Sequence, residues 1–157
     1  MPRYSVIAGY IEIFFPGSAS VLDLGCGYGI LYEKVRLLND HYYLGVDISQ
    51  EAINHAVSTY DKPELFICED IEKYDPKRKF DVIIFNESLY YIDNPVGLVE
   101  RYFNYLTDGG YIIISMWDYK ERNNKIWKLL DKKFSEFDGI YYRHISGKSW
   151  YIKVFKK

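Results

Sequence analysis

The sequence contains little cysteine and little proline, and it has no strong excess of charge of either sign. Its 157 residues include two cysteines and five prolines, and 20 basic residues nearly balance 22 acidic ones, for a formal net charge of -2. The cysteines, Cys26 and Cys68, form no C-x-x-C pair, so the sequence predicts neither a disulfide scaffold nor a cysteine-rich zinc site. We expect both to be reduced thiols in a cytoplasmic protein.

Signals for several classes of partner are also missing. The balanced charge gives no general attraction for nucleic acid or for an anionic membrane. No apolar run approaches the ~20 residues of a transmembrane helix, and the first residues lack the pattern of a signal peptide. The three histidines are scattered without the spacing of metal ligands. We therefore expect no nucleic-acid partner, no membrane contact and no metal site.

Short apolar runs alternate with segments of helical apolar spacing. The apolar runs predict strands at 20–24, 41–47, 65–68, 80–86, 111–115, 140–145 and 150–155. The helical spacing predicts helices at 3–14, 29–38, 50–60, 95–106 and 121–136. Ser49 and Asn94 are expected to cap two of these helices, and the turn at 146–149 joins the last two strands into a hairpin.

This order of elements is typical of the α/β class. It predicts one domain over residues 1–157, with a doubly wound and mostly parallel sheet. The apolar run at 80–86 is almost continuous, as expected for a parallel strand that is covered on both faces. We therefore expect helices on both faces of the sheet and one antiparallel strand from the terminal hairpin.

The glycines after the first predicted strand are the most informative feature. In the segment VLDLGCGYG at 21–29, three glycines alternate directly after an apolar run. Glycine permits positive φ and lets a ligand lie against bare backbone, and such strand-to-helix turns hold nucleotide-like cofactors in α/β proteins. The pattern G-x-G-x-G matches neither the dinucleotide fingerprint G-x-G-x-x-G nor a P-loop. It favours a nucleoside cofactor without a pyrophosphate.

Polar residues lie at the ends of four predicted strands. They are Asp23, Asp47, Asp70 and Asn86. In an open parallel sheet, ligands bind beyond the carboxyl ends of the strands, where the strand order reverses. A single aspartate at such a position is usually a turn former or a helix cap, but four in succession predict one binding crevice.

Taken in order, these motifs resemble those of the class I S-adenosylmethionine-dependent methyltransferases. DLGCGYG at 23–29 resembles the first motif of that family, GVDIS at 45–49 its acidic second-strand motif, and CEDI at 68–71 its adenine motif. FDVIIFN at 80–86 resembles its fourth strand, and LTDGGYIIIS at 106–115 its following turn and fifth strand. The resemblance implies a Rossmann-like, seven-stranded sheet whose last strand is antiparallel, and S-adenosylmethionine as the cofactor.

The expected cofactor contacts follow from this resemblance and from side-chain chemistry. Asp47, about 20 residues beyond the glycine loop, would accept hydrogen bonds from the ribose diol. The resemblance assigns Asp70 and the Ile71 backbone N–H to the adenine. Asp23 would support the ammonium through water, and the carbonyls near Gly25 and Asn86 would accept from it directly. The further expected contacts are Gly27 and Gly29, which let the chain pass close by, Cys26 as a small filler, and Ile48.

The segment NESLYYI at 86–92 is the candidate for binding the methyl acceptor. Glu87 could accept a proton from a nucleophile or anchor an amine, and Tyr90 or Tyr91 could line the pocket or contact the sulfonium with its ring. The alternative is that Leu89 and Ile92 pack in the core while the tyrosines cover them. Of these residues, Glu87 and Tyr91 are our expected catalytic residues. The segment is similar to one of nodulation-type N-methyltransferases, which act on small sugar substrates.

The sequence therefore predicts methyl transfer from S-adenosylmethionine to a nitrogen or oxygen of a small molecule. A non-catalytic cofactor-binding or partner module of a methyltransferase complex is an open alternative, because the acceptor side is minimal. An aminopropyl transferase on the same fold is disfavoured, since Asn86 and Glu87 offer only one carboxylate for a polyamine. Short segments around the predicted pocket leave open a homodimer that completes it.

Overall fold

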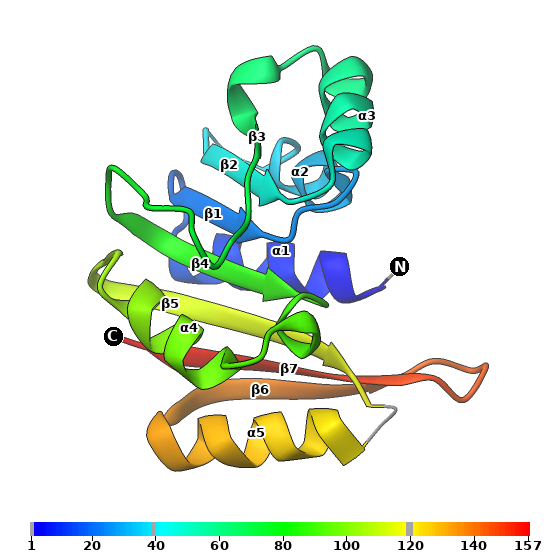
Figure 1. Cartoon of the computed structure of the whole chain (residues 1–157), viewed down its shortest axis with the longest axis vertical. Helices are drawn as coiled ribbons and strands as arrows, with labels where there is room; N and C mark the ends of the chain where they lie inside the picture. The colour runs from blue at the N-terminus through cyan, green and yellow to red at the C-terminus, as the bar shows by residue number, and fades with distance from the viewer. Residues whose placement is uncertain (1, 39, 119–120) are drawn as a thin grey trace.

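The computed structural model describes residues 2–38, 40–118 and 121–157. These residues form a seven-stranded sheet with the strand order β3-β2-β1-β4-β5-β7-β6 (Figure 1). The strands are β1 (Ser20–Leu24), β2 (Tyr42–Asp47), β3 (Phe66–Cys68), β4 (Phe80–Asn86), β5 (Leu106–Trp117), β6 (Glu136–Arg143) and β7 (Ser149–Lys156). The pairs from β3 to β5 are parallel, whereas β7 is antiparallel to both β5 and β6. The predicted mostly parallel sheet with one antiparallel strand is confirmed.

Helices cover both faces of the sheet, as predicted. Two short 3-10 helices, η1 (Pro63–Leu65) and η2 (Leu89–Tyr91), accompany α1 (Pro2–Phe14), α2 (Ile30–Val35), α3 (Gln50–Tyr60), α4 (Pro95–Phe103) and α5 (Glu121–Lys133). Buried residues of α1, α2 and α3 form one core cluster with the sheet, and those of α4 and α5 form another (Figure 1). Ser49 and Asn94 cap α3 and α4 by accepting from backbone N–H groups. Within the described residues, no helix has the length and apolar character that crossing a bilayer requires.

Several element ends differ from the predictions. Helix α2 ends at Val35 because the following hydrogen bonds join residues three apart: the Leu38 N–H donates to the Val35 carbonyl. The helix predicted at 95–106 ends at Phe103, because Leu106 pairs with Phe80 as the first residue of β5. Tertiary pairing thus outweighs the helical spacing of Leu106.

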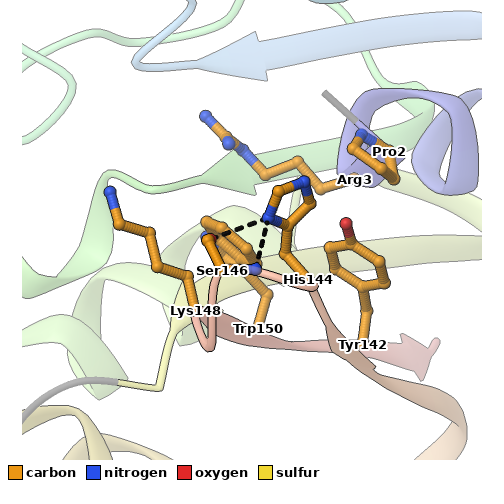
Figure 2. A pocket seen from close by; sticks show the side chains of 7 residues that line it. All are labelled: Pro2, Arg3, Tyr142, His144, Ser146, Lys148 and Trp150. Carbon is orange, nitrogen blue, oxygen red and sulfur yellow. Dashed lines mark hydrogen bonds between the residues drawn. The ribbon is translucent and has the colours of Figure 1, made fainter.

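The terminal hairpin is also longer than predicted. Strand β6 begins at Glu136, which pairs with Phe155, and ends at Arg143, so His144 lies in the hairpin turn. The Glu136 carboxylate is 2.7 Å from Lys153 on the paired strand, and this ion pair fastens the start of β6. The hairpin reaches past the sheet to the start of α1, where Arg3 faces Trp150 (Figure 2).

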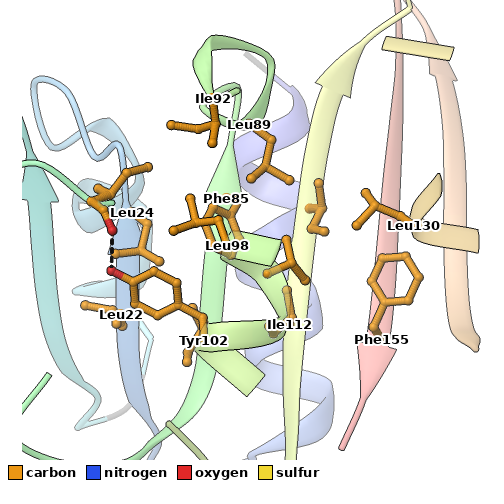
Figure 3. Packing of buried hydrophobic residues seen from close by; sticks show 14 of the residues in the cluster. Leu22, Leu24, Phe85, Leu89, Ile92, Leu98, Tyr102, Ile112, Leu130 and Phe155 are labelled. Atoms are coloured by element: carbon orange, nitrogen blue, oxygen red, sulfur yellow. Dashed lines mark hydrogen bonds between the residues drawn. The ribbon is translucent and has the colours of Figure 1, made fainter. Parts of the chain in front are cut away.

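The centre of the sheet is fully buried. Along β4 and β5, successive side chains alternate between the two core clusters, and residues 82–85 are 0% exposed. Figure 3 shows Leu22, Phe85 and Ile112 of the sheet facing Leu98 and Tyr102 of α4. Each such buried side chain contributes about 1.5–3 kcal/mol relative to exposure, so this packing holds the ends of β1 and β4 in place.

Candidate functional site

The strand order reverses between β1 and β4, because the chain leaves β1 toward β2 and returns at β4 on its other side. A cavity of about 360 Å³ lies at the carboxyl ends of these strands. It has the size of a small-molecule site. The cavity is lined by seven of the residues that the sequence analysis selected, namely Gly25, Asp47, Ile48, Asp70, Ile71, Glu87 and Tyr91.

The glycine loop after β1 is the floor of this cavity. Gly25 has a φ of +83°, and a Cβ there would lie 2.6 Å from the Cβ of Ser88. Its N–H donates to the Val46 carbonyl at 2.8 Å, and the Ser88 hydroxyl donates to the Leu24 carbonyl at 2.8 Å. Only glycine therefore allows this close packing of the loops after β1 and β4. Ser88 and Ile92 of the segment 86–92 also line the cavity, as does Glu72, which the sequence analysis did not select.

Asp47 is held by backbone donors on both of its carboxylate oxygens. Oδ2 accepts from the Gly27 N–H at 2.8 Å, and Oδ1 accepts from the Ser49 N–H at 2.9 Å. Each carboxylate oxygen can accept about two hydrogen bonds, so both retain capacity for a ligand. A fixed carboxylate with free lone pairs suits a vicinal diol.

Asp70 and Ile71 form the wall on the β3 side. The Asp70 Oδ1 accepts from the Glu72 N–H at 2.9 Å, and its Oδ2 lies 3.6 Å from the Lys73 ammonium. The Ile71 carbonyl accepts from the Tyr102 hydroxyl at 2.9 Å, which ties the wall to α4. This wall presents a carboxylate beside an apolar side chain, a combination that fits the amino group and the flat ring of an adenine.

Asp23 lies beneath the loop instead of lining the cavity. It is 1% exposed, and its Oδ2 accepts from the Tyr43 hydroxyl at 2.7 Å. Burial raises the pKa of Asp23 to about 7, against the hydrogen bond from Tyr43, which lowers it. Among the described residues, no group donates to its Oδ1. An unpaired buried carboxylate oxygen favours a cation nearby, so Asp23 fits the predicted support of an ammonium.

The other predicted cofactor residues also lie outside the cavity lining. Cys26 is buried with its sulfur against Gly45, as a filler would be. Gly29 faces the rings of Tyr60 and Phe66, and a Cβ there would lie 2.9 Å from Tyr60. The absence of a side chain at Gly29 thus makes room for these rings, and its predicted role in letting the chain pass close to the cofactor stays a prediction.

The end of β4 carries Asn86 and Glu87. The Asn86 Oδ1 accepts from the Arg3 Nε at 3.3 Å. Glu87 has a φ of +63°, a conformation that costs a non-glycine residue about 1–3 kcal/mol and is typical of functional sites. Its carboxylate accepts from the Tyr90 hydroxyl at 3.1 Å and from the Ser115 hydroxyl at 3.3 Å. Burial raises the pKa of Glu87, and the charge of Arg3 opposes this shift.

The residues after Glu87 divide between core and rim. Leu89 and Ile92 are buried in the core, as the structural alternative predicted (Figure 3). Tyr91 lines the cavity but is 77% exposed, whereas Tyr90 is half-buried and bonded to Glu87. The hydroxyl that contacts the candidate base therefore belongs to Tyr90, whereas Tyr91 lines the cavity.

Comparison with known sequences identifies related chains. A family model described as a methyltransferase domain matches residues 3–152. Malonyl-[acyl-carrier protein] O-methyltransferase 1 of Ilyobacter polytropus is 36% identical over 121 residues, which cover 73% of this chain and 45% of that protein. A ubiquinone biosynthesis O-methyltransferase of Bradyrhizobium diazoefficiens is 31% identical over 115 residues, which cover 71% of this chain and 43% of that protein. The chain thus spans less than half the length of these curated relatives.

Solved structures share the fold. The N-methyltransferase NodS from Bradyrhizobium japonicum superimposes with a TM-score of 0.79 at 16% identity, covering 99% of this chain and 94% of that chain. NodS has also been solved with S-adenosyl-L-homocysteine, with a TM-score of 0.79 at 17% identity, covering 99% of this chain and 86% of that one. Magnesium protoporphyrin IX methyltransferase from Synechocystis, solved with bound S-adenosylmethionine, gives a TM-score of 0.77 at 16% identity, with coverages of 99% and 79%.

Proposed function

Since the chain belongs to the class I S-adenosylmethionine-dependent methyltransferases, we propose that it transfers a methyl group from S-adenosylmethionine to a nitrogen or oxygen of a small molecule. The observation that carries this proposal is the cavity where the strand order reverses. Asp47 and Asp70 line it from the β2 and β3 side, and Glu87 lines it from the end of β4. Hydrogen-bond acceptors for a nucleoside and a carboxylate that can take up a proton thus line the same cavity.

Each residue on the cofactor side has a proposed task. Asp47 accepts from the ribose diol, since two backbone donors fix its carboxylate. Asp70 accepts from the adenine amino group while Ile48 and Ile71 contact the ring. Asp23 supports the ammonium from below, because its buried Oδ1 has no donor among the described residues. Bound there, the cofactor would supply a methyl group that a positively charged sulfur has already activated.

Glu87 is the proposed general base. A nitrogen or hydroxyl nucleophile must lose a proton as it is methylated, and a carboxylate beside the cavity can accept that proton. Burial raises the pKa of Glu87 and makes its carboxylate a stronger base than an exposed glutamate. The hydroxyls of Tyr90 and Ser115 orient it from the side.

Whether the methylated atom of the acceptor is a nitrogen or an oxygen is left open by the proposal. The curated relatives above are named as O-methyltransferases, whereas NodS is named as an N-methyltransferase. A phosphoethanolamine N-methyltransferase of Arabidopsis thaliana is 30% identical over 108 residues, which cover 64% of this chain and 21% of that protein. These names support a small or carrier-bound acceptor, and they leave the methylated atom to experiment.

Calorimetry and a transfer assay test the proposal in sequence. We expect binding of S-adenosylmethionine and of its demethylated product, followed by transfer of a labelled methyl group to some member of a panel of amines and hydroxyl compounds. Binding without transfer to any acceptor would favour the non-catalytic module. Tighter binding of the decarboxylated cofactor would favour the aminopropyl transferase, and absence of all binding would overturn the proposed function.

A further inference from the structure

A second cavity, of about 250 Å³, lies between the start of α1 and the β6–β7 hairpin (Figure 2). We name it the hairpin pocket. It lies outside the cavity described above, and it shares no lining residue with it. Besides Pro2, its lining consists of Arg3, Tyr142, His144, Ser146, Lys148 and Trp150.

Two cationic side chains and a histidine belong to the lining of the hairpin pocket. Arg3 and Lys148 are cationic side chains, and no carboxylate belongs to the lining in the part of the chain that the structure describes. The Ser146 N–H donates to the His144 Nδ1 at 3.1 Å, so in a neutral ring the proton sits on Nε2, which is then a donor (Figure 2). Donors and positive charge together select an oxyanion.

Aromatic rings hold the cationic groups in position. The rings of Tyr142 and Trp150 stack with their centroids 5.7 Å apart. The Arg3 guanidinium carbon lies 4.5 Å from the centre of the Tyr4 ring and 5.8 Å from that of Trp150. The Lys148 ammonium lies 5.6 Å from the Trp117 ring. These cation–π contacts restrict both cationic side chains, and the flat Tyr142 and Trp150 rings of the lining offer a surface for an apolar or planar ligand body.

Arg3 connects the hairpin pocket with the candidate base. Its Nε donates to the Asn86 Oδ1 at 3.3 Å, and Asn86 directly precedes Glu87. The charge of Arg3 also acts on the Glu87 carboxylate, whose pKa it lowers. The pocket therefore adjoins the acceptor side of the cavity, because Arg3 lines the pocket and also bonds to Asn86 at the end of β4.

We propose that the hairpin pocket binds a carboxylate or phosphate group of the methyl acceptor, so that the nucleophilic atom of the same molecule reaches Glu87. This inference rests on the proposed function and specifies its substrate class, namely anionic small molecules. A neutral amine or alcohol lacks the group that Arg3 and Lys148 recognise. Such a compound is therefore a weaker acceptor than its anionic counterpart.

The test uses simple aromatic probes on the whole chain saturated with S-adenosyl-L-homocysteine. Calorimetry compares the binding of benzoate, phenyl phosphate and neutral benzamide. Benzoate tests recognition of a carboxylate, and phenyl phosphate tests recognition of a phosphate. We expect at least one anion to bind about ten-fold more tightly than benzamide, and Lys148→Met to remove about ten-fold of that affinity. Lys148→Arg should restore it. The matched control is Lys79→Met, because Lys79 is exposed at the opposite end of β4.

Three results would overturn the inference. They are equal binding of benzamide and both anions, an equal loss in Lys148→Met and Lys79→Met, and anion binding that occurs only when S-adenosyl-L-homocysteine is left out, which would locate the anion in the cofactor cavity. The proposed function fails separately, if S-adenosyl-L-homocysteine does not bind or if no acceptor receives a methyl group. Anion binding with the expected variant pattern would still support the hairpin pocket in that case.

Discussion

The site is built in two ways: backbone N–H groups of nearby turns hold Asp47 and Asp70 in one half, whereas side-chain hydroxyls hold Glu87 in the other, together with the Trp117 backbone. In the cofactor half, formed by the loops after β1, β2 and β3, Asp47 accepts from the N–H groups of Gly27 and Ser49. Asp70 accepts from the N–H of Glu72 in the same manner. Such contacts require only a local turn of the backbone, and they leave acceptor capacity on the carboxylates for a ligand.

The acceptor half consists of the segment after β4, the start of α1 and the β6–β7 hairpin. Here Glu87 is held by the hydroxyls of Tyr90 and Ser115, and Asn86 is held by Arg3, a residue 83 positions away. Tyr90 lies three residues from Glu87, but the Ser115 and Arg3 contacts depend on which side chains the tertiary structure brings together. We therefore expect adenosyl binding in the cofactor half to depend on local turns, and the geometry of the acceptor half to depend on long-range contacts.

Removing the charge of Glu87 is the largest expected change to the acceptor half. Glu87→Gln should lower kcat by about 100-fold or more, because a positioned general base contributes roughly 10²–10⁴-fold. Affinity for S-adenosyl-L-homocysteine should change little, since Asp47 and Asp70 are untouched. The acidic limb of the pH–rate profile should also disappear, because a base with a raised pKa must lose its proton before it can act.

Glu69→Gln is the matched control for that variant. Glu69 is exposed directly after β3, and it contacts Asp47 only through its own backbone N–H. Its replacement should leave kcat and cofactor affinity near the wild-type values. Equal turnover of Glu87→Gln and Glu69→Gln would make Glu87 a structural residue and would remove the distinction between the two halves.

Asp23 lies under the cofactor half and should make its stability depend on pH. Its pKa rises from 3.8 to about 7 on folding. The folded state therefore holds a proton that the unfolded state has lost, and the stability contributed by this group is full below pH ~4 and is lost as the pH rises to about 7. The loss amounts to at most about 4 kcal/mol.

Denaturant unfolding between pH 4 and 8 checks this expectation. Asp23→Asn should flatten the fall in the free energy of unfolding with pH, and the variant should be the more stable protein near pH 8. Parallel curves for Asp23→Asn and wild type would mean that Asp23 does not titrate in this range. Such a result would also weaken its proposed role beside a cation.

The contrast between the halves explains what the sequence could predict. Glycines and aspartates at strand ends act through nearby backbone, so Gly25, Asp47 and Asp70 were selected correctly as cavity residues. The contact of Ser88 with Gly25 joins loops 63 positions apart in the chain, and Glu87, directly before Ser88, has a positive φ. No local pattern carries such information.

Burial and element ends were likewise decided by tertiary structure. Asp23 was expected in the crevice, but Tyr43 and the glycine loop cover it. Leu106 has helical spacing, yet pairing with Phe80 makes it the start of β5. The hairpin pocket combines the start of α1 with residues near the other end of the chain, so it has no sequence signature.

Asp47→Asn is the corresponding change to the cofactor half. An amide offers an N–H where the carboxylate now accepts from the Gly27 or Ser49 N–H, so the variant loses acceptors for both backbone and diol. Hydrogen bonds to charged groups contribute about 1.5–3 kcal/mol each, so affinity for S-adenosyl-L-homocysteine should fall on the order of 100-fold. Calorimetry measures it, with Asp108→Asn, exposed in β5, as the control. Similar losses in both variants would remove the ribose assignment.

The smallest expected effect separates the two neighbouring tyrosines of the acceptor half. Tyr90→Phe removes the hydroxyl that donates to Glu87 at 3.1 Å, so it should lower kcat/KM by roughly 3- to 10-fold, in line with the ~1 kcal/mol of an ordinary hydrogen bond. Its pH–rate profile should move to higher pH, because this bond lowers the pKa of Glu87. Tyr91→Phe removes a hydroxyl from a ring that is 77% exposed, so kcat/KM and the profile should stay near wild type. A reversed order, with Tyr91→Phe the more damaging, would return the catalytic role to the residue that the sequence selected. It would also mean that side chains at the open rim, not those bonded to Glu87, control the acceptor half.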